Sequence, residues 1–137
     1  MAFEKLDLEI VTPERLVLAE TVDSVVLPGS EGSFGVLPGH APFLTALAAG
    51  EMSYRVGGQE KFLAVSGGFV EVLRDRVSVL AGTCERPDEI DADRARQARE
   101  RAEAVLKDPG AGQAEVLRAQ ERIRRADARL QVLRRGA

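Results

Sequence analysis

Apolar and polar residues alternate along the first half of the chain with the period of β-strands. Leu6, Leu8 and Ile10 are separated by acidic residues, which is the pattern of a strand with one buried face. The same alternation recurs at residues 70–72 and 77–79, and short apolar runs occupy residues 16–18, 25–27 and 62–65. Pairs typical of turns separate these runs, at residues 28–29, 38–39, 57–58, 67–68 and 74–75. The pattern predicts an antiparallel β-sandwich or barrel, and the absence of a crossover helix argues against a parallel sheet.

The last third of the chain has a helical period instead. Two apolar series have spacings of three and four residues: Ala95, Ala98, Ala102 and Val105, then Val116, Ala119, Ile123, Ala126, Leu130 and Leu133. Asp91 and Asp93 suit the start of the first helix and Lys107 suits its end, because of the helix dipole. The segment Asp-Pro-Gly-Ala-Gly at 108–112 cannot continue a helix. This region predicts an antiparallel two-helix hairpin.

The charges divide the chain at the same place. Residues 1–90 hold seven basic and fourteen acidic side chains, whereas residues 91–137 hold twelve basic and eight acidic ones, including eleven of the sixteen arginines. We therefore expect a mainly β plus α protein: a β-sandwich domain over 1–85, a linker at 86–90 and a helical hairpin over 91–137. Because alanines make up half of its apolar seam, the hairpin should need the sandwich, a ligand or a partner to hold it.

Several classes of function are excluded by what the sequence lacks. Cys84 is the one cysteine and His40 the one histidine, so neither a disulfide nor a cysteine or multi-histidine metal site can form, and no metal is required. No nucleophile motif or P-loop lysine is present, which predicts that the protein is not an enzyme. The start of the chain lacks the basic and apolar regions of a signal peptide, and no stretch is apolar enough to span a bilayer, so we expect a cytosolic-side protein. The overall acidity and the scarcity of aromatic residues argue against nucleic acid as a partner.

Four arginines in the predicted hairpin form a candidate anion site. Arg94 and Arg101 lie two helical turns apart on the first helix, and Arg125 and Arg129 form an i, i+4 pair on the second. Two antiparallel helices could bring these guanidinium groups together around a phosphate. Alternatively, the arginines coat a solvated surface and pair with Glu100, Glu103 and Glu121, and spacing alone favours this second interpretation. His40 is likewise either a loop histidine bonded to nearby backbone or a contact to a partner.

Longer motifs connect the chain to a known family. Residues 29–47 contain Gly-Ser-Glu-Gly followed by Gly-Val-Leu-Pro-Gly-His-Ala-Pro-Phe-Leu-Thr-Ala-Leu, and residues 66–72 read Ser-Gly-Gly-Phe-Val-Glu-Val. The segment Ile-Asp-Ala-Asp-Arg-Ala at 90–95 is similar to the I/L-D-x-x-R-A signature at the start of a helix. With these motifs, the chain resembles the epsilon subunit of bacterial F-type ATP synthases over essentially its full length.

The resemblance implies a ten-stranded β-sandwich followed by two helices, in a non-catalytic subunit of the central stalk of a proton-translocating ATP synthase. It implies that the sandwich binds the gamma subunit and rests on the ring of c subunits, peripherally on the cytoplasmic face of the bacterial plasma membrane. The implied ring contacts are Glu31, Gly32, Ser33 and His40. Many relatives have an acidic residue where this chain has Ser33, which implies a weaker polar contact here.

The resemblance also implies a regulatory hairpin. Folded on the sandwich, the hairpin permits turnover, and extended along gamma into the alpha/beta catalytic head it blocks ATP hydrolysis. Some relatives bind ATP as a regulatory ligand in the folded hairpin, and their binding positions correspond to Glu85, Ile90, Asp91, Arg94, Ala95, Arg101, Arg125 and Arg129. In this hypothesis Asp91 accepts from the adenine amino group and the arginines hold phosphate oxygens. The alternatives are a stand-alone nucleotide-sensing module and an arginine-rich adaptor that binds nucleic acid or another helical protein.

Overall fold

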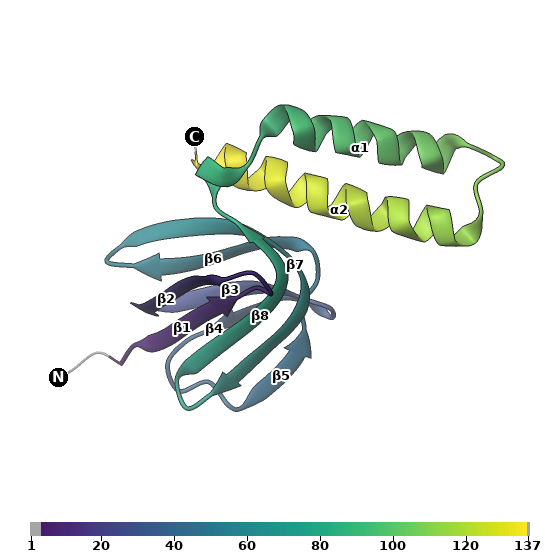
Figure 1. The fold of residues 1–137 in the computed structure, drawn as a ribbon. Helices are drawn as coiled ribbons and strands as arrows, with labels where there is room; N and C mark the ends of the chain where they lie inside the picture. The colour runs from purple at the N-terminus through teal and green to yellow at the C-terminus, as the bar shows by residue number, and fades with distance from the viewer. Residues whose placement is uncertain (1–3, 137) are drawn as a thin grey trace.

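The computed structural model describes residues 4–136, and within them the strands precede the helices (Figure 1). The strands are β1 (Leu6–Val11), β2 (Leu16–Val22), β3 (Ser24–Gly29), β4 (Gly32–Val36), β5 (Phe43–Ala46), β6 (Gly50–Val56), β7 (Gln59–Leu73) and β8 (Arg76–Glu85). A single 3₁₀ turn, η1 (Pro87–Glu89), leads into the helices α1 (Ala92–Lys107) and α2 (Gln113–Gly136). The predicted β-sandwich followed by a two-helix hairpin is confirmed. The described residues form eight strands where ten were expected, because long strands such as the 15-residue β7 run without interruption.

Strand β7 organises the sheet, whose order is β2-β1-β8-β7-β6-β3-β4 with β5 added beside β7. The first part of β7 pairs with β6, from Gln59 to Val65, and the second part pairs with β5, from Phe69 to Val72. The turn predicted at residues 67–68 is wrong, since β7 continues through both glycines at positive φ. A Cβ on Gly68 would lie 1.7 Å from the Leu80 carbonyl oxygen, so only glycine fits where β7 changes its neighbour.

The sheet contains one parallel pair, which the sequence did not predict. Strand β1 runs parallel to β8, with Leu8 beside Val77, whereas the other pairs are antiparallel. Parallel neighbours need a long connection, which is usually a helix. Here the six strands between β1 and β8 in the chain make that connection. The turn predicted at residues 28–29 is also displaced, because both residues belong to β3 and the chain turns at Ser30 and Glu31.

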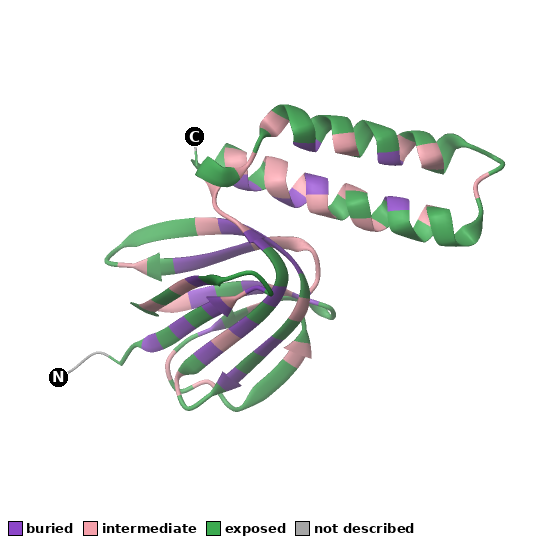
Figure 2. Ribbon diagram, in the orientation of Figure 1, coloured by how far each residue is buried: buried purple, intermediate pink, exposed green. Residues whose placement is uncertain are grey.

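The core lies inside the folded sheet and follows the predicted alternation, visible in Figure 2 as alternating purple and green segments. The inward side chains of β1, β7 and β8 that are at most 1% exposed include Leu6, Leu8, Ile10, Val70, Val72, Val77 and Val79. Every buried residue of this cluster lies between positions 6 and 84. Cys84 belongs to it and is 5% exposed. Burial raises its pKa to about 11, which keeps the thiol protonated and unreactive near neutral pH.

Because the hairpin contributes no buried residue to this core, the sandwich should fold alone. A chain that ends after Ile90 is expected to give a β-type circular dichroism spectrum and one cooperative thermal transition. Loss of the hairpin uncovers only the small patch around Ala64, so the free energy of unfolding should fall by about 1–2 kcal/mol. Full-length protein melted in parallel is the control. An unfolded or aggregated truncation would contradict the boundary expected near residue 86.

The two helices form the predicted hairpin, and α2 is the helix that packs on β6 and β7, with α1 outside it (Figure 1). Asp91 caps α1 as expected, since its Oδ1 accepts from the Arg94 backbone N–H at 3.1 Å. Four alanines of the predicted seam are buried, namely Ala95, Ala102, Ala119 and Ala126, while its larger members on α2 are only partly buried. No helix in residues 4–136 combines the length and apolarity that crossing a bilayer requires.

Helix α2 has a second buried face, which the seam did not predict. Ala128 and Val132 pack against Ala64 of β7, with Phe62 and Ile90 at the edge of the cluster. Val132 is 0% exposed. This small apolar patch, together with two ion pairs described below, attaches the hairpin to the sandwich.

Candidate functional site

A pocket of about 220 Å³ lies at the base of the hairpin, between the end of β8 and the two helices. It is lined by Glu85, Glu89, Asp91, Arg94, Ala95, Ala98, Arg101 and Arg129. A second pocket of about 390 Å³ lies farther along the groove between α1 and α2, lined by Ala98, Arg101, Ala102, Val105, Arg122, Arg125 and Arg129. Three residues are common to both linings, so the two pockets adjoin. We call them together the arginine pocket.

The arginine pocket gathers most of the residues that the family resemblance selected. Six of those eight positions line its first part, and Arg125 lines its second part. Ile90 lines neither part and lies instead against the cluster of Ala64, Ala128 and Val132. The four arginines of the candidate anion site, from both helices, therefore border one continuous groove.

Two of the three carboxylates at the pocket are paired with arginines, and four of the pocket's five arginines are in no ion pair among the described residues. Glu85 Oε1 accepts from Arg129 Nε at 2.6 Å, and Glu89 is paired with an arginine of the sandwich. Between residues 4 and 136, no ion pair involves Arg94, Arg101, Arg122 or Arg125. Guanidinium groups with donors to spare suit the oxygens of a phosphate.

The alternative of a self-paired solvated surface applies to other arginines of the hairpin. Glu103 pairs with Arg99 at 3.2 Å, and Glu121 lies 3.6 Å from Arg124. Two of the three carboxylates that were expected to pair with the candidate arginines therefore engage different partners. The groove keeps an excess of positive charge, which favours an anionic ligand.

The size and polarity of the groove limit what it could hold. Its first part, at about 220 Å³, is smaller than the roughly 300–1,000 Å³ usual for ligand pockets, so a ligand as large as a nucleotide must also enter the second part. Asp91 Oδ1 is occupied by the helix cap, which leaves Oδ2 as the oxygen that could accept from a base. Among the described residues, no cluster suited to hold a metal ion is found.

Sequence reasoning did not assign five lining residues to the groove: Glu89, Arg122 and three members of the predicted apolar seam, Ala98, Ala102 and Val105. Arg122 stands three positions before Arg125 and seven before Arg129, so its helical spacing could have identified it. Ala98 follows Arg94 by four positions and could have been found in the same way. Glu89 had no such signal, because it lies in η1 and reaches the pocket only through the path of the linker.

A second feature lies on the outer face of the sheet. Direct pairing places Ala46, Phe69, Leu80, Val11 and Leu16 side by side across β5, β7, β8, β1 and β2. Leu16 and Phe69 are each 57% exposed and Leu80 is 56% exposed. We call this line of residues the apolar row. A continuous exposed apolar surface of this kind is typical of a protein interface.

The residues of the apolar row also form a recognisable pattern in the sequence. Phe69 precedes the buried Val70, Leu80 follows the buried Val79, and Leu16 precedes the buried Val17. Two successive apolar residues in a strand place one on each face. The outer faces of these strands are therefore apolar where a solvated sheet would be polar.

The expected ring-contact residues fall in two separate places. Glu31 occupies the turn before β4, and Gly32 and Ser33 begin that strand, all exposed to solvent. His40 lies in the loop after β4, where its Nδ1 is 2.6 Å from the Ala41 carbonyl oxygen. This contact is the backbone bond that the first interpretation of His40 predicted.

Hydrogen bonds show how the two groups are separated. Ser30 N–H donates to the Ala46 carbonyl at 3.0 Å, beside Phe69 in the middle of β7. Gly39 N–H donates to Asp75 Oδ1 at 2.7 Å, at the tip of the β7–β8 hairpin. The structure therefore does not bring His40 to the Glu31 turn, and the expected ring contacts lie at two separate places.

Known proteins match the chain along nearly its whole length. The family model described as "ATP synthase, Delta/Epsilon chain, beta-sandwich domain" matches residues 5–87, and "ATP synthase, Delta/Epsilon chain, long alpha-helix domain" matches residues 88–134. The chain is 53% identical over 129 residues to the ATP synthase epsilon chain of Syntrophobacter fumaroxidans, covering 94% of this chain and 96% of the relative. It is 50% identical over 132 residues to the corresponding chain of Nitratidesulfovibrio vulgaris, with coverage of 94% and 96%.

A solved structure shares the fold. A chain in the Euglena gracilis mitochondrial ATP synthase, from a structure of its OSCP, F1 and c-ring parts, superposes with a TM-score of 0.82 at 25% identity. The match covers 93% of this chain and 79% of the Euglena chain. The similarity therefore includes both the sandwich and most of the hairpin.

Proposed function

The chain belongs to the ATP synthase delta/epsilon family as an epsilon-type chain, and we propose that it is a non-catalytic regulator in the central stalk of a bacterial enzyme. In this role it sits peripherally on the cytoplasmic face of the plasma membrane, between the catalytic head and the membrane ring. The Euglena relative was solved together with such a head and ring. The role needs a sandwich surface that binds the rotor and a hairpin that can leave the sandwich.

The observation that carries the stalk role is the apolar row. Leu16, Phe69 and Leu80 are each more than half exposed on one face of a rigid sheet, and burying such side chains contributes roughly 1.5–3 kcal/mol each. The occupant that we propose is the gamma subunit, because the family resemblance implies that the sandwich binds gamma. Exposed turns at Glu31 and at His40 are the proposed contacts to the ring of c subunits.

The regulatory role is supported by the small interface between hairpin and sandwich. Its apolar part is the cluster around Val132, and its polar part consists of the Arg129–Glu85 pair and of Arg135, whose Nε lies 3.4 Å from Glu51 Oε2. The Arg135 guanidinium also stacks 5.5 Å above the Phe62 ring. An attachment of this size is weak enough for a partner to displace.

We further propose that ATP is the ligand that stabilises the hairpin in its position on the sandwich. The arginine pocket exists only while α1, α2 and the end of β8 are together, so a bound anion would stabilise this compact state alone. Arg94, Arg101 and Arg125 would hold phosphate oxygens. Arg129 would contribute beside Glu85, and Asp91 would face the base.

The experiment that tests the stalk role is recovery of the assembly. Affinity-tagged full-length chain, expressed in a bacterium whose own epsilon gene is deleted, should co-purify with gamma and c subunits from detergent-solubilised membranes. Glu31→Lys and His40→Ala, made separately, should reduce recovery of the ring severalfold while recovery of gamma is kept. Both residues are on the surface, so the melting temperature of each variant should stay within about 2 °C of the wild type. Recovery of the chain without gamma would contradict the stalk role.

A further inference from the structure

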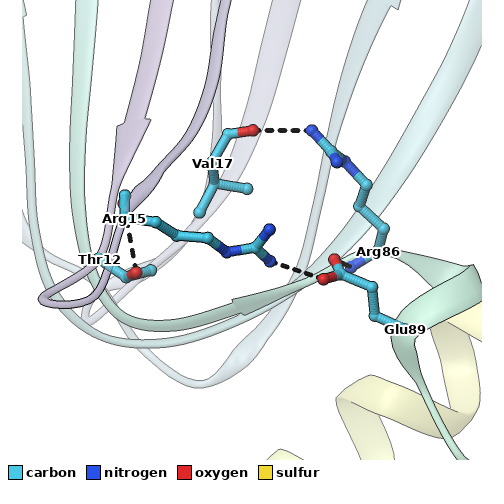
Figure 3. Close-up of polar contacts among 5 residues, drawn as sticks. All are labelled: Thr12, Arg15, Val17, Arg86 and Glu89. Atoms are coloured by element: carbon cyan, nitrogen blue, oxygen red, sulfur yellow. Dashed lines mark hydrogen bonds and ion pairs between the residues drawn. The ribbon is translucent and has the colours of Figure 1, made fainter.

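The linker between sandwich and hairpin is held on the sandwich by two arginines (Figure 3). Arg15 Nη2 lies 2.6 Å from Glu89 Oε2, and Arg86 Nη2 donates to the Val17 carbonyl at 2.7 Å. Arg15 is 74 positions from Glu89 along the chain. These contacts join the linker to the β1–β2 turn and to the start of β2, neither of which lines the arginine pocket.

Each partner of this contact is itself held in position. Thr12 N–H donates to the Arg15 carbonyl at 2.9 Å, which closes the β1–β2 turn. Glu89 uses its other oxygen, Oε1, to accept from the Arg86 backbone N–H at 3.0 Å, and Glu89 N–H donates back to the Arg86 carbonyl. The Glu89 carboxylate thus accepts from a side chain of the sandwich and from the linker backbone at once. These bonds hold the pKa of Glu89 below its usual range, so the group is an anion at neutral pH.

This arrangement bears on the arginine pocket because Glu89 is one of its lining residues. A bare carboxylate at the rim would repel a phosphate, and the Arg15 guanidinium, which lines neither part of the pocket, offsets that charge. The same contact fixes η1, and η1 is followed directly by Ile90 and by Asp91, the cap of α1. The direction in which α1 leaves the sandwich therefore depends on Arg15.

We propose that Arg15 is a positioning residue of the arginine pocket: through Glu89 it pins the start of the hairpin to the β1–β2 turn and cancels the negative charge at the rim. This inference rests on the proposed anion site, and it adds the sandwich turn to the elements that control that site. It also places the pivot of the hairpin after Glu89, at Ile90 and Asp91, both of which have extended backbone angles.

A double-mutant cycle on the full-length protein tests whether Arg15 cancels the charge of Glu89 at the rim of the arginine pocket. Binding of ATP and of inorganic tripolyphosphate is measured by calorimetry for wild type, Arg15→Gln, Glu89→Gln and the double variant. Arg15→Gln should weaken binding about fivefold, because it leaves the Glu89 charge uncompensated. Glu89→Gln should bind at least as well as wild type, and the double variant should bind like Glu89→Gln. Arg15→Lys, which keeps the charge, is the conservative control and should stay within twofold of wild type.

If Arg15 acts only as one more positive charge near the ligand, Arg15→Gln will weaken binding equally with Glu89 or Gln at position 89, and the proposal is overturned. Hydrogen exchange without ligand tests the pinning. The backbone N–H groups of Glu89 and Ile90 are bonded to the Arg86 and Pro87 carbonyls, and they should exchange severalfold faster in Arg15→Gln while β7 and β8 are unchanged. If these two N–H groups exchange at the same rate in Arg15→Gln as in wild type, Arg15 does not pin the start of the hairpin. Failure of wild type to bind either anion overturns the anion site itself and, with it, the electrostatic role of Arg15.

Discussion

Leu80→Glu and Phe69→Glu are each expected to abolish binding of the chain to the gamma subunit, with at least a hundredfold loss of affinity. Both side chains are more than half exposed in the middle of the apolar row, so the sandwich should tolerate the change. In the complex, the new carboxylate would be buried without a partner, and an unpaired buried charge costs about 3–5 kcal/mol. Titration of purified gamma with each variant gives the affinity, and circular dichroism melts verify the fold.

Leu117→Glu is the matched control for these variants. Leu117 is 58% exposed, close to the value for Leu80, but it lies on α2 near the hairpin turn and away from the apolar row. Its replacement should leave gamma binding within about twofold of wild type. If Leu117→Glu weakened binding as much as Leu80→Glu, or if neither did, the apolar row would not be the gamma-binding surface.

Removal of two arginines is expected to abolish the effect of ATP on the hairpin. At a concentration one hundred times its dissociation constant, a ligand that binds only the compact state stabilises it by about 2.7 kcal/mol. Wild type with ATP should therefore show a higher melting temperature and slower hydrogen exchange in α1. Arg125→Ala combined with Arg129→Ala should lose both effects, because these residues are two of the three arginines on the α2 side of the groove. The melting temperature of the sandwich should not change.

Two further variants test whether the loss of the ATP effect comes from the pocket arginines themselves. One removes the same charge elsewhere on α2, and the other leaves the attachment of the hairpin intact. Arg118→Ala with Arg124→Ala removes the same charge from α2, and neither residue lines the arginine pocket, so the ATP effect should persist. Arg125→Ala alone leaves the Arg129–Glu85 pair in place and should still weaken ATP binding by about tenfold. Absence of ATP binding by wild type at millimolar concentration would contradict the ligand proposal and leave the stalk role unaffected.

The sequence by itself determined the features that depend on neighbours along the chain. Alternation identified the inward faces of β1, β7 and β8, because successive strand residues point to opposite sides. The turns at residues 57–58 and 74–75 were predicted correctly, and the structure has both at positive φ. The same holds for the cap at Asp91 and the alanine seam of the hairpin. Each follows from local backbone chemistry, so single-sequence reasoning could reach it.

The candidate site was only partly accessible in this way. Helical spacing and the family resemblance selected Arg94, Arg101, Arg125 and Arg129, and the structure lines one groove with all four. Spacing could not tell which carboxylates these arginines would meet, since Arg129 pairs with Glu85 from β8. Which pairs form depends on how the hairpin sits on the sandwich.

Only the tertiary structure decided the contacts between segments that are distant in sequence. These include the parallel pairing of β1 with β8, the second buried face of α2, the contact of Arg15 with Glu89, and the assembly of the apolar row from five strands. A residue pattern states which face of an element is apolar, but it does not state which other element will cover that face. That choice depends on strand register and on the docking angle of the helices, which are set when the whole core closes.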